Sequence, residues 1–327
     1  MTLGKFLRRM LASVVLLLFV VAAGLYVFTI WQAGVIEARF PPLGKFVSVE
    51  GGRLHYAEAL PAGEPRATVL LLHGASGNQA NMMAPLGAAL TRRGYRVIAF
   101  DRPGHGWSER ILGEAAASPA VQARLIAAAL RQLGVARAII VAHSLAGVVA
   151  LNFALDQRDV TQAVVLVSPV SHPWPGGVNW TYRAAAHPLL GPLFTNIVVL
   201  PAGLLRMPRS IAGIFAPEPA PPDFAQATAA ALVLRPREFR DNAQDVVRLY
   251  DFVVEQAPRY PGIGVPVAIL TGDKDSVVLT HIHSYGNARD IPGATLKIIP
   301  GAGHAPHFAH AEDVAAAVDE VEAKANR

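Results

Sequence analysis

The chain has 327 residues, of which 52% are hydrophobic and 16% are charged, with a formal net charge of +5 and no cysteine. The absence of cysteine excludes a disulfide framework, a cysteine-ligated metal site and a thiol nucleophile. Because Lys and Arg are scattered along the chain rather than gathered in a basic stripe, we expect no nucleic-acid partner. The length suits one large domain, or one domain with an inserted lid.

The first predicted element is an apolar helix at residues 11–31. This stretch has no charged residue and is about 20 residues long, which is enough to span the hydrocarbon core of a bilayer. Residues 1–10 are basic, and Trp31 stands at the far end like an interfacial anchor. The positive-inside tendency places the N-terminus in the cytoplasm and the catalytic part of the chain in the periplasm or outside the cell, although two basic residues beyond the helix oppose this orientation.

A cleaved signal peptide is the alternative for this segment, because Val21-Ala22-Ala23 offers small residues for a cleavage site. The apolar run continues beyond that site to Ile30, whereas the hydrophobic region of a signal peptide is usually shorter. We therefore favour an uncleaved, single-pass anchor. Residues 32–44, which include two consecutive prolines, are predicted to link it to a globular domain at residues 45–327.

Strands and helices alternate in the first half of that domain. Apolar or alternating runs predict strands at 45–49, 53–58, 67–72, 96–100, 138–142 and 163–167. Helical spacing predicts helices at 81–93, 119–133 and 145–155. This alternation is typical of an α/β fold in which a mostly parallel sheet is covered by helices on both faces.

The alternation stops between about residues 170 and 260. Strand signals are largely missing there, and helical spacing appears at 224–234 and 245–256. We expect an inserted helical cap rather than a second independent domain. The α/β pattern then resumes with strands at 267–270 and 295–299 and a final helix at 311–325. The cap is rich in aromatic and aliphatic residues, which suits either a lipophilic substrate or simply the cap's own core.

A serine stands at the predicted sharp turn between the strand at 138–142 and the helix that follows it. Small residues lie two positions on either side of Ser144, where the nucleophile-elbow pattern G-x-S-x-G has glycines. Here they are Ala142 and Ala146, which keep the tight turn feasible. Such a short motif is a weak signal without partners elsewhere in the chain.

Candidate partners follow two later strands. Acidic residues come after the strand at 267–270, at Asp273 and Asp275, and His304 comes after the strand at 295–299. The carboxyl ends of parallel strands share one edge of a sheet, so a carboxylate, His304 and Ser144 can meet there. A serine that attacks, a histidine that takes its proton and a carboxylate that orients the histidine are what nucleophilic acyl transfer needs.

The ordered set of motifs resembles the α/β-hydrolase family, of the cap-containing type that includes esterases, lipases, epoxide hydrolases, dehalogenases and haloperoxidases. The motifs are His73-Gly74, Asp101-Arg102-Pro103-Gly104-His105-Gly106, Ala142-His143-Ser144-Leu145-Ala146-Gly147, Gly272-Asp273-Lys274-Asp275 and Gly303-His304. They extend over the chain from about residue 45 and occur in the chain order Ser, Asp, His of that family.

The resemblance implies a role for each site residue. Ser144 is the nucleophile, His304 the base and Asp275 the acid, since the family spacing favours Asp275 over Asp273. The backbone N–H groups of Ala75 and Leu145 form the oxyanion hole, worth about 3–4 kcal/mol each in related mechanisms. Epoxide hydrolases and dehalogenases use a carboxylate nucleophile, so a serine at this position argues against both.

Other polar residues of these motifs are predicted to be structural. His73 is expected to tie loops together beside the oxyanion hole, and His143 to pack under the serine turn. Asp101 and Arg102 are expected to hold a turn by polar contacts.

The remaining histidines of the C-terminal part are not expected in the site. His307 and His310 are interpreted as surface or pocket-rim residues. His281 and His283 are spaced two apart but have no third ligand at metal-binding spacing, so we interpret them as loop or helix-surface residues and expect no metal.

The sequence therefore predicts a membrane-anchored serine hydrolase that cleaves an ester or related acyl bond of a lipophilic small molecule, with no metal or organic cofactor. Two alternatives remain open. The same three residues also suit hydrolysis of a C–C bond in a dienoate, or perhydrolase or haloperoxidase chemistry. A non-catalytic binding protein on the same fold is the third interpretation, and the presence of all three residues speaks against it.

Overall fold

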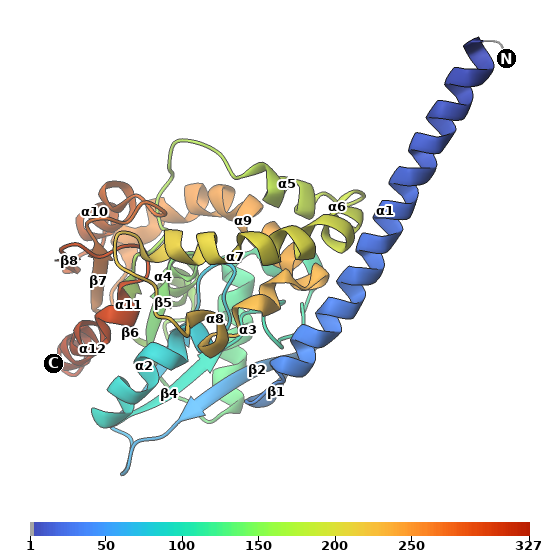
Figure 1. The fold of residues 1–327 in the computed structure, drawn as a ribbon. Coiled ribbons are helices and arrows are strands. Elements are labelled where there is room, and N and C mark those ends of the chain that lie inside the picture. The colour runs from blue at the N-terminus through green and yellow to red at the C-terminus, as the bar shows by residue number, and fades with distance from the viewer. Residues whose placement is uncertain (1–2) are drawn as a thin grey trace.

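The computed structural model describes residues 3–327 and contains one eight-stranded sheet (Figure 1). The strands are β1 (Lys45–Val49), β2 (Gly52–Ala59), β3 (Ala67–Leu72), β4 (Tyr95–Phe100), β5 (Ala138–His143), β6 (Thr161–Val167), β7 (Val267–Gly272) and β8 (Thr295–Ile299). Their order in the sheet is β1-β2-β4-β3-β5-β6-β7-β8. Only the pairs β1–β2 and β2–β4 are antiparallel, so the predicted mostly parallel sheet is confirmed.

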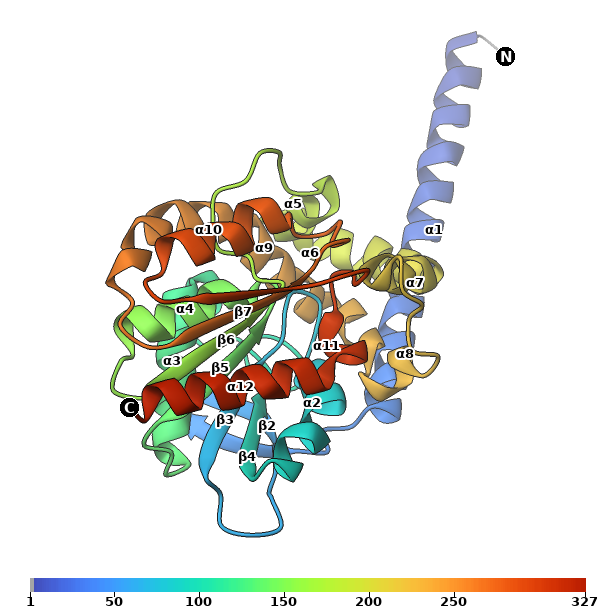
Figure 2. The same cartoon turned by 90° about the vertical axis from the view of Figure 1, so that its left-hand side faces the viewer.

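Helices cover both faces of this sheet (Figure 2). On one face lie α2 (Ala80–Arg92) and α12 (Ala311–Ala325), and on the other lie α3 (Pro119–Gln132) and α4 (Ala146–Asp156). Alternate residues of β3 serve the two faces, since Leu71 packs with α2 and α12 while Leu70 and Leu72 pack on the other side. A strand buried on both faces must be apolar throughout, which explains the unbroken run of Ala67–Leu72.

Smaller helical elements complete the α/β part of the chain. They are η1 (Gly113–Ala117), α10 (Thr280–Asp290) and α11 (Pro306–Ala309). No helix was predicted for residues 280–290, because this polar segment has little apolar periodicity to reveal one.

The segment between β6 and β7 is helical, as expected of a cap. It contains α5 (Trp180–Ala186), α6 (Gly191–Phe194), the π-helical η2 (Thr195–Val199), α7 (Leu200–Phe215), α8 (Phe224–Ala227), η3 (Ala230–Leu234), α9 (Pro236–Gln256) and η4 (Ala257–Gly262). The helix predicted at 224–234 is wrong in its middle, where Ala229 adopts a left-handed conformation with φ of 49° and separates α8 from η3. The helix predicted at 245–256 begins earlier, at Pro236, because proline is well suited to the first turn of a helix.

The N-terminal helix α1 (Leu3–Arg39) projects from the body and carries mostly exposed apolar side chains (Figure 1). It has the length and composition of a membrane anchor or a signal sequence. The expected linker is helical up to Arg39, so the helix continues directly from the apolar segment onto the body. There Ile36 packs with Leu200 and Leu234 of the cap.

Candidate active site

The serine turn between β5 and α4 holds Ser144 in a left-handed conformation with φ of 55°. The Ser144 N–H donates to the carbonyl of Val167 at 3.0 Å, and the Ser144 carbonyl accepts from the N–H groups of Gly147 and Val170, each at 2.9 Å. A non-glycine residue is strained in this region and stays there only where its surroundings hold it, as these three hydrogen bonds do. Gly147 is needed because a Cβ there would lie 2.6 Å from the Cβ of Pro169.

Ser144, His304 and Asp275 form one hydrogen-bonded chain. The Nε2 atom of His304 lies 2.9 Å from Ser144 Oγ, and its Nδ1 lies 2.8 Å from Asp275 Oδ2. All three residues are at most 9% exposed. Because an ionised carboxylate can only accept, Nδ1 carries the proton in this arrangement and Nε2 is left to accept from the serine hydroxyl.

The acidic partner is itself fixed by the backbone. Asp275 Oδ1 accepts the N–H groups of Val277 and Val278, at 2.9 and 2.8 Å. The alternative carboxylate, Asp273, instead accepts the N–H of Gly301 at 2.7 Å and belongs to the turn before His304. The structure thus brings Asp275, rather than Asp273, to the histidine.

Two backbone donors stand free beside the serine. Within residues 3–327, neither the Ala75 N–H nor the Leu145 N–H has a hydrogen-bond partner. The loop that carries Ala75 approaches the serine turn closely, since a Cβ on Gly74 would lie 2.8 Å from Ser144 Cβ. Only glycine permits that approach. This arrangement can hold an anionic oxygen next to Ser144 Oγ.

A cap residue that sequence reasoning missed holds this loop in place. The buried Asn242 of α9 accepts the Ser76 N–H at 2.7 Å and donates to Ser76 Oγ at 3.1 Å. Ser76 is left-handed, with φ of 57°, so this pair of bonds fixes the residue directly after Ala75. An asparagine in a polar helix of the cap carries no sequence signal that points to a loop 166 residues away.

A histidine cluster packs under the serine turn. His143 donates from Nε2 to the backbone carbonyl of His304 at 2.9 Å, and its ring lies 4.5 Å from that of His307. The expectation that His307 lies at the surface or pocket rim is wrong, because α11 turns it inward until it is 1% exposed. Burial holds the pKa of His143 well below its usual value and lowers the pKa of His307 to about 3, so both rings are neutral beside His304.

The other predicted non-site histidines are also placed by the structure. His310 is half-buried, with Nε2 3.4 Å from Glu218. His281 is exposed on α10, as expected, but His283 is buried on the same helix. Its Nδ1 accepts the N–H groups of Ser171 and His172 at 3.2 and 3.1 Å, so it packs against the start of the cap rather than lying at the surface.

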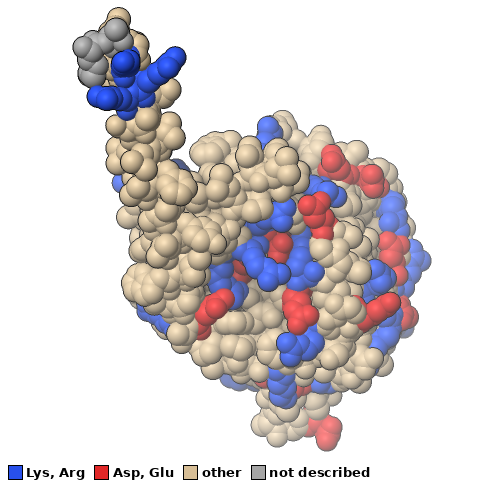
Figure 3. All heavy atoms as spheres, turned by 90° about the vertical axis from the view of Figure 1, so that its right-hand side faces the viewer, with Lys and Arg blue, Asp and Glu red and all other residues tan. Residues whose placement is uncertain are grey.

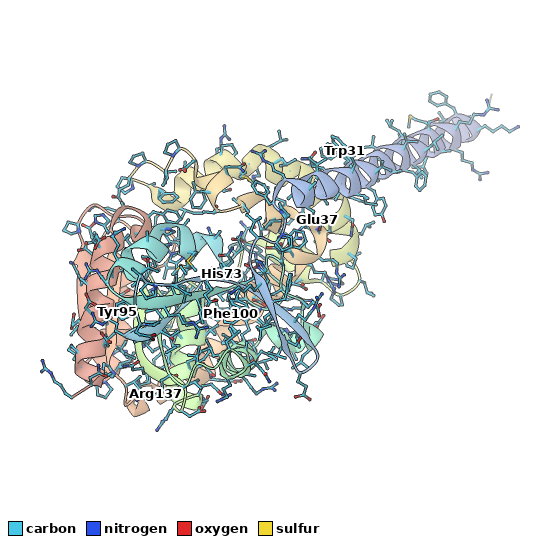
Figure 4. All side chains as sticks on the ribbon, turned by 90° about the horizontal axis from the view of Figure 1, so that it is seen from below. Trp31, Glu37, His73, Tyr95, Phe100 and Arg137 are labelled. Carbon is cyan, nitrogen blue, oxygen red and sulfur yellow. The ribbon has the colours of Figure 1, made fainter. Side chains whose placement is uncertain are left out.

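The loops beside the site are tied together as expected. His73 lies in the interior of the body, where Nε2 accepts the Arg102 N–H at 3.0 Å (Figure 4). The fully buried Arg102 donates to the carbonyls of His73 and Gly74 at 2.9 and 3.1 Å. Its Nη1 also lies 2.8 Å from Asp245 of α9, a link between the core and the cap that was not predicted. Asp101 accepts the Trp107 N–H at 2.8 Å and thereby holds the turn after β4, and it also binds His55 Nδ1 of β2 at 2.7 Å.

A protein family and several known proteins are similar to this chain in sequence. The profile of the Alpha/beta hydrolase family matches residues 69–317. The dihydrolipoyllysine-residue acetyltransferase component of the acetoin cleaving system of Cupriavidus necator is 28% identical over 82% of this chain, which spans 66% of that protein's length. The 2-hydroxy-6-oxo-6-phenylhexa-2,4-dienoate hydrolase of Burkholderia cepacia is 26% identical over 82% of this chain and 92% of its own.

A solved structure resembles the whole chain. It is that of a membrane phospholipase A described as a bacterial virulence factor, with a TM-score of 0.61 and 22% identity, and it covers 98% of this chain and 99% of its own. At this level of identity the likeness shows a shared fold.

Proposed function

The chain belongs to the alpha/beta hydrolase family, and we propose that it is a membrane-anchored serine hydrolase that cleaves an ester or related acyl bond of a lipophilic substrate. The observation that carries this proposal is the chain of hydrogen bonds from Ser144 Oγ through His304 to Asp275. Two free backbone N–H groups beside the serine complete the set that acyl transfer requires.

In the proposed reaction, Ser144 Oγ attacks the carbonyl carbon of the substrate while His304 Nε2 takes the hydroxyl proton. The negative charge that forms on the carbonyl oxygen is held by the N–H groups of Ala75 and Leu145. As the tetrahedral intermediate collapses, His304 returns the proton to the leaving alcohol. Water, activated by His304, then attacks the acyl-serine, and the carboxylic acid leaves with Ser144 regenerated. Asp275 holds the neutral imidazole in the required tautomer and stabilises the imidazolium that forms each time His304 takes a proton.

The side chains packed around the serine turn are apolar, which suits a lipophilic substrate. Leu145 and Val148 after the serine pack with Leu249 and Val253 of the cap helix α9 and with Val278 after β7. A substrate with an alkyl chain gains about 25 cal/mol for each Å² of its apolar surface that leaves water on binding. The fold likeness to a membrane phospholipase A and the apolar helix α1 agree with an ester that resides in a membrane.

Labelling with a fluorophosphonate probe tests the nucleophile. The full-length protein in detergent should be labelled, Ser144→Ala should abolish the label and His304→Ala should strongly reduce it. Ser210→Ala, which removes an exposed serine of α7, is the matched control and should label like the wild type. A folded wild-type protein that resists the probe would refute the hydrolase proposal and leave the binding-protein alternative.

A second candidate reaction is hydrolysis of a C–C bond, because one relative is named as a dienoate hydrolase. The two reactions are separated by substrate. We expect a series of p-nitrophenyl esters to be hydrolysed with kcat/KM that rises with acyl length. Turnover of a 2-hydroxy-6-oxo-dienoate, with little esterase activity across the series, would favour the alternative.

A further inference from the structure

The cap exposes a row of large apolar side chains on its outer side. Between α5 and α7 six such residues are 39–83% exposed, and we call them the outer cap face: Trp180, Leu189, Leu190, Leu193, Val198 and Leu205. Together α6, η2 and α7 form a continuous helical stretch, Gly191–Phe215, that is long and apolar enough to be compared with a membrane span, although its buried side packs on the protein. Scattered exposed leucines are normal, but a concentration of them within one short segment marks an interaction surface.

The outer cap face lies beside the N-terminal helix. Both η2 and α7 contact α1, and Leu200 and Leu204 share a cluster with Phe28 and Ala33 of that helix. These contacts fall at the end of the apolar segment predicted to span the bilayer, where a transmembrane helix leaves the hydrocarbon core. Figure 3 shows the uncharged shaft of α1 passing into an uncharged part of the body, whereas acidic and basic residues mix over the rest of that face.

The charges in this segment have one sign. Residues 170–217 contain three arginines and neither Asp nor Glu. Two of the arginines, Arg206 and Arg209, lie exposed on α7 next to Leu205. Within the part of the chain that the structure describes, neither guanidinium has a hydrogen-bond or ion-pair partner. Exposed apolar side chains flanked by unpaired arginines are the pattern of a helix that lies in the headgroup region of an anionic membrane.

We propose that the outer cap face lies in the interfacial layer of the bilayer that α1 enters, with its leucines among the upper acyl chains and Arg206 and Arg209 at lipid phosphates. This inference rests on the proposed membrane anchor, but not on the identity of the reaction. The long arginine side chains reach the phosphates while their helix stays among apolar groups. The bilayer is the occupant that fits, because α1 fixes its position next to this face.

The docked helix also contacts the active-site histidine. The backbone N–H of His304 donates to the carbonyl of Ile214, near the end of α7, at 3.0 Å. A Cβ on Gly303 would lie 2.6 Å from the carbonyl oxygen of Phe215, so the two segments are packed without a gap. The helix that carries Leu205 of the outer cap face therefore ends directly against the segment that holds the active-site histidine.

The absence of cysteine allows this placement to be measured directly on the full-length protein. Leu193→Cys and Leu205→Cys each receive a bimane fluorophore, and the protein is reconstituted into vesicles of equal parts phosphatidylcholine and phosphatidylglycerol. Brominated phospholipid quenches fluorophores in the bilayer, and iodide quenches those in water. Leu17→Cys in α1 is the control for a lipid position, and Glu64→Cys, in the loop between β2 and β3 away from α1, is the control for water (Figure 1).

We expect the labels at positions 193 and 205 to be quenched several-fold more by brominated lipid than the label at Glu64→Cys, and to be protected from iodide. Iodide access equal to that of the Glu64→Cys label, with the Leu17→Cys label still in lipid, would overturn the docking while leaving the anchor. Protection from both quenchers would overturn it in favour of a protein partner, such as a second copy of the chain. A Leu17→Cys label in water would overturn both the anchor and the docking, whereas probe labelling of Ser144 reports on the hydrolase separately.

The role of the two arginines has its own test. In the Leu205→Cys background, replacing phosphatidylglycerol by phosphatidylcholine should reduce quenching by brominated lipid. Arg206→Gln with Arg209→Gln should remove this dependence on anionic lipid. Arg124→Gln, an exposed arginine of α3, is the matched control and should retain it. Fluorophosphonate labelling in detergent should be unchanged in every variant. Equal lipid dependence in the wild type and the double variant would overturn the assignment of these arginines to lipid phosphates.

Discussion

Neutralising Asp245 should weaken the attachment of the cap to the core. This buried carboxylate accepts hydrogen bonds from Arg102 at 2.8 Å, Arg110 at 2.7 Å and Gln122 at 2.9 Å. Asp245→Asn keeps the shape of the side chain but leaves the fully buried Arg102 guanidinium without a counter-charge. The next carboxylate, Asp241, is 3.8 Å from Arg110 and does not contact Arg102.

The expected loss of stability follows from that burial. Removing one partner of a buried ion pair costs about 3–5 kcal/mol, because the other charge stays desolvated and uncompensated. With an unfolding entropy of about 2.1 cal/mol/K per residue, a chain of this length has a total of about 0.7 kcal/mol/K. The melting temperature of Asp245→Asn should therefore fall by about 4–7 °C, measured by calorimetry in detergent.

The matched control is Glu114→Gln, which makes the same chemical change in an exposed ion pair. Glu114 lies in η1, 3.2 Å from Arg248, which stands on α9 as Asp245 does. Exposed pairs contribute about 0–1 kcal/mol, so this variant should melt within about 2 °C of the wild type. If Asp245→Asn and Glu114→Gln lower the melting temperature equally, the buried pair of Asp245 and Arg102 does not hold the cap on the core.

Three further predictions concern the site and its supports. Asn242→Ala should lower kcat by a factor approaching the ~100-fold cost of one lost oxyanion donor, with little change in KM. Asn242→Asp should recover part of the lost kcat, because its carboxylate can still accept the Ser76 N–H. Gly303→Ala should slow fluorophosphonate labelling by about 100-fold, since the added Cβ forces α7 and the loop that carries His304 apart. Gly264→Ala is the control and should label normally, because a Cβ there meets no atom within 4 Å. Burial lowers the pKa of His283 to about 4. Between about pH 6.5 and 4 the folded protein therefore binds fewer protons than the unfolded chain, and its stability should fall as the pH falls through that range. Urea unfolding at several pH values should show a shallower decline for His283→Gln, and an unchanged slope would contradict the assignment.

The sequence located the candidate site residues because their positions depend on a simple rule of parallel sheets. Ser144 follows β5, Asp275 follows β7 and His304 follows β8, and the carboxyl ends of these strands share one edge. Each strand is an apolar run that ends at a turn motif, so local signals alone placed these side chains at that edge. This rule does not choose between Asp275 and Asp273, because both residues follow β7 in the same turn. The family spacing favoured Asp275, and that is the residue that the structure brings to His304.

The cap offered no comparable rule. Its helices lack a common edge, so the sequence does not indicate which polar residue of α9 faces the core. Asn242 and Asp245 lie one helical turn apart and contact loops that precede them by more than a hundred residues. The left-handed Ala229 has no side-chain feature that signals a break, since alanine ordinarily favours a helix. His307 was misplaced for a similar reason, because a four-residue helix such as α11 has too little periodicity to reveal its buried side.

Arg235 shows how differently the cap is bound to the core and to α1. Its guanidinium contacts the carbonyl of Gly106 in a core loop, the buried Glu238 of α9, and Glu37 of α1 at 3.2 Å. Glu37 is half-exposed on the part of α1 that meets the body, so its pair with Arg235 is screened by water and contributes about 0–1 kcal/mol (Figure 4). Glu238 is 4% exposed and also accepts the Gly106 N–H at 2.9 Å, so its loss would leave a buried cation and an unsatisfied donor. The polar contacts of Arg235 therefore bind the cap to the core more strongly than to α1. A change in the tilt of α1 against the body is opposed mainly by its apolar contacts with η2 and α7.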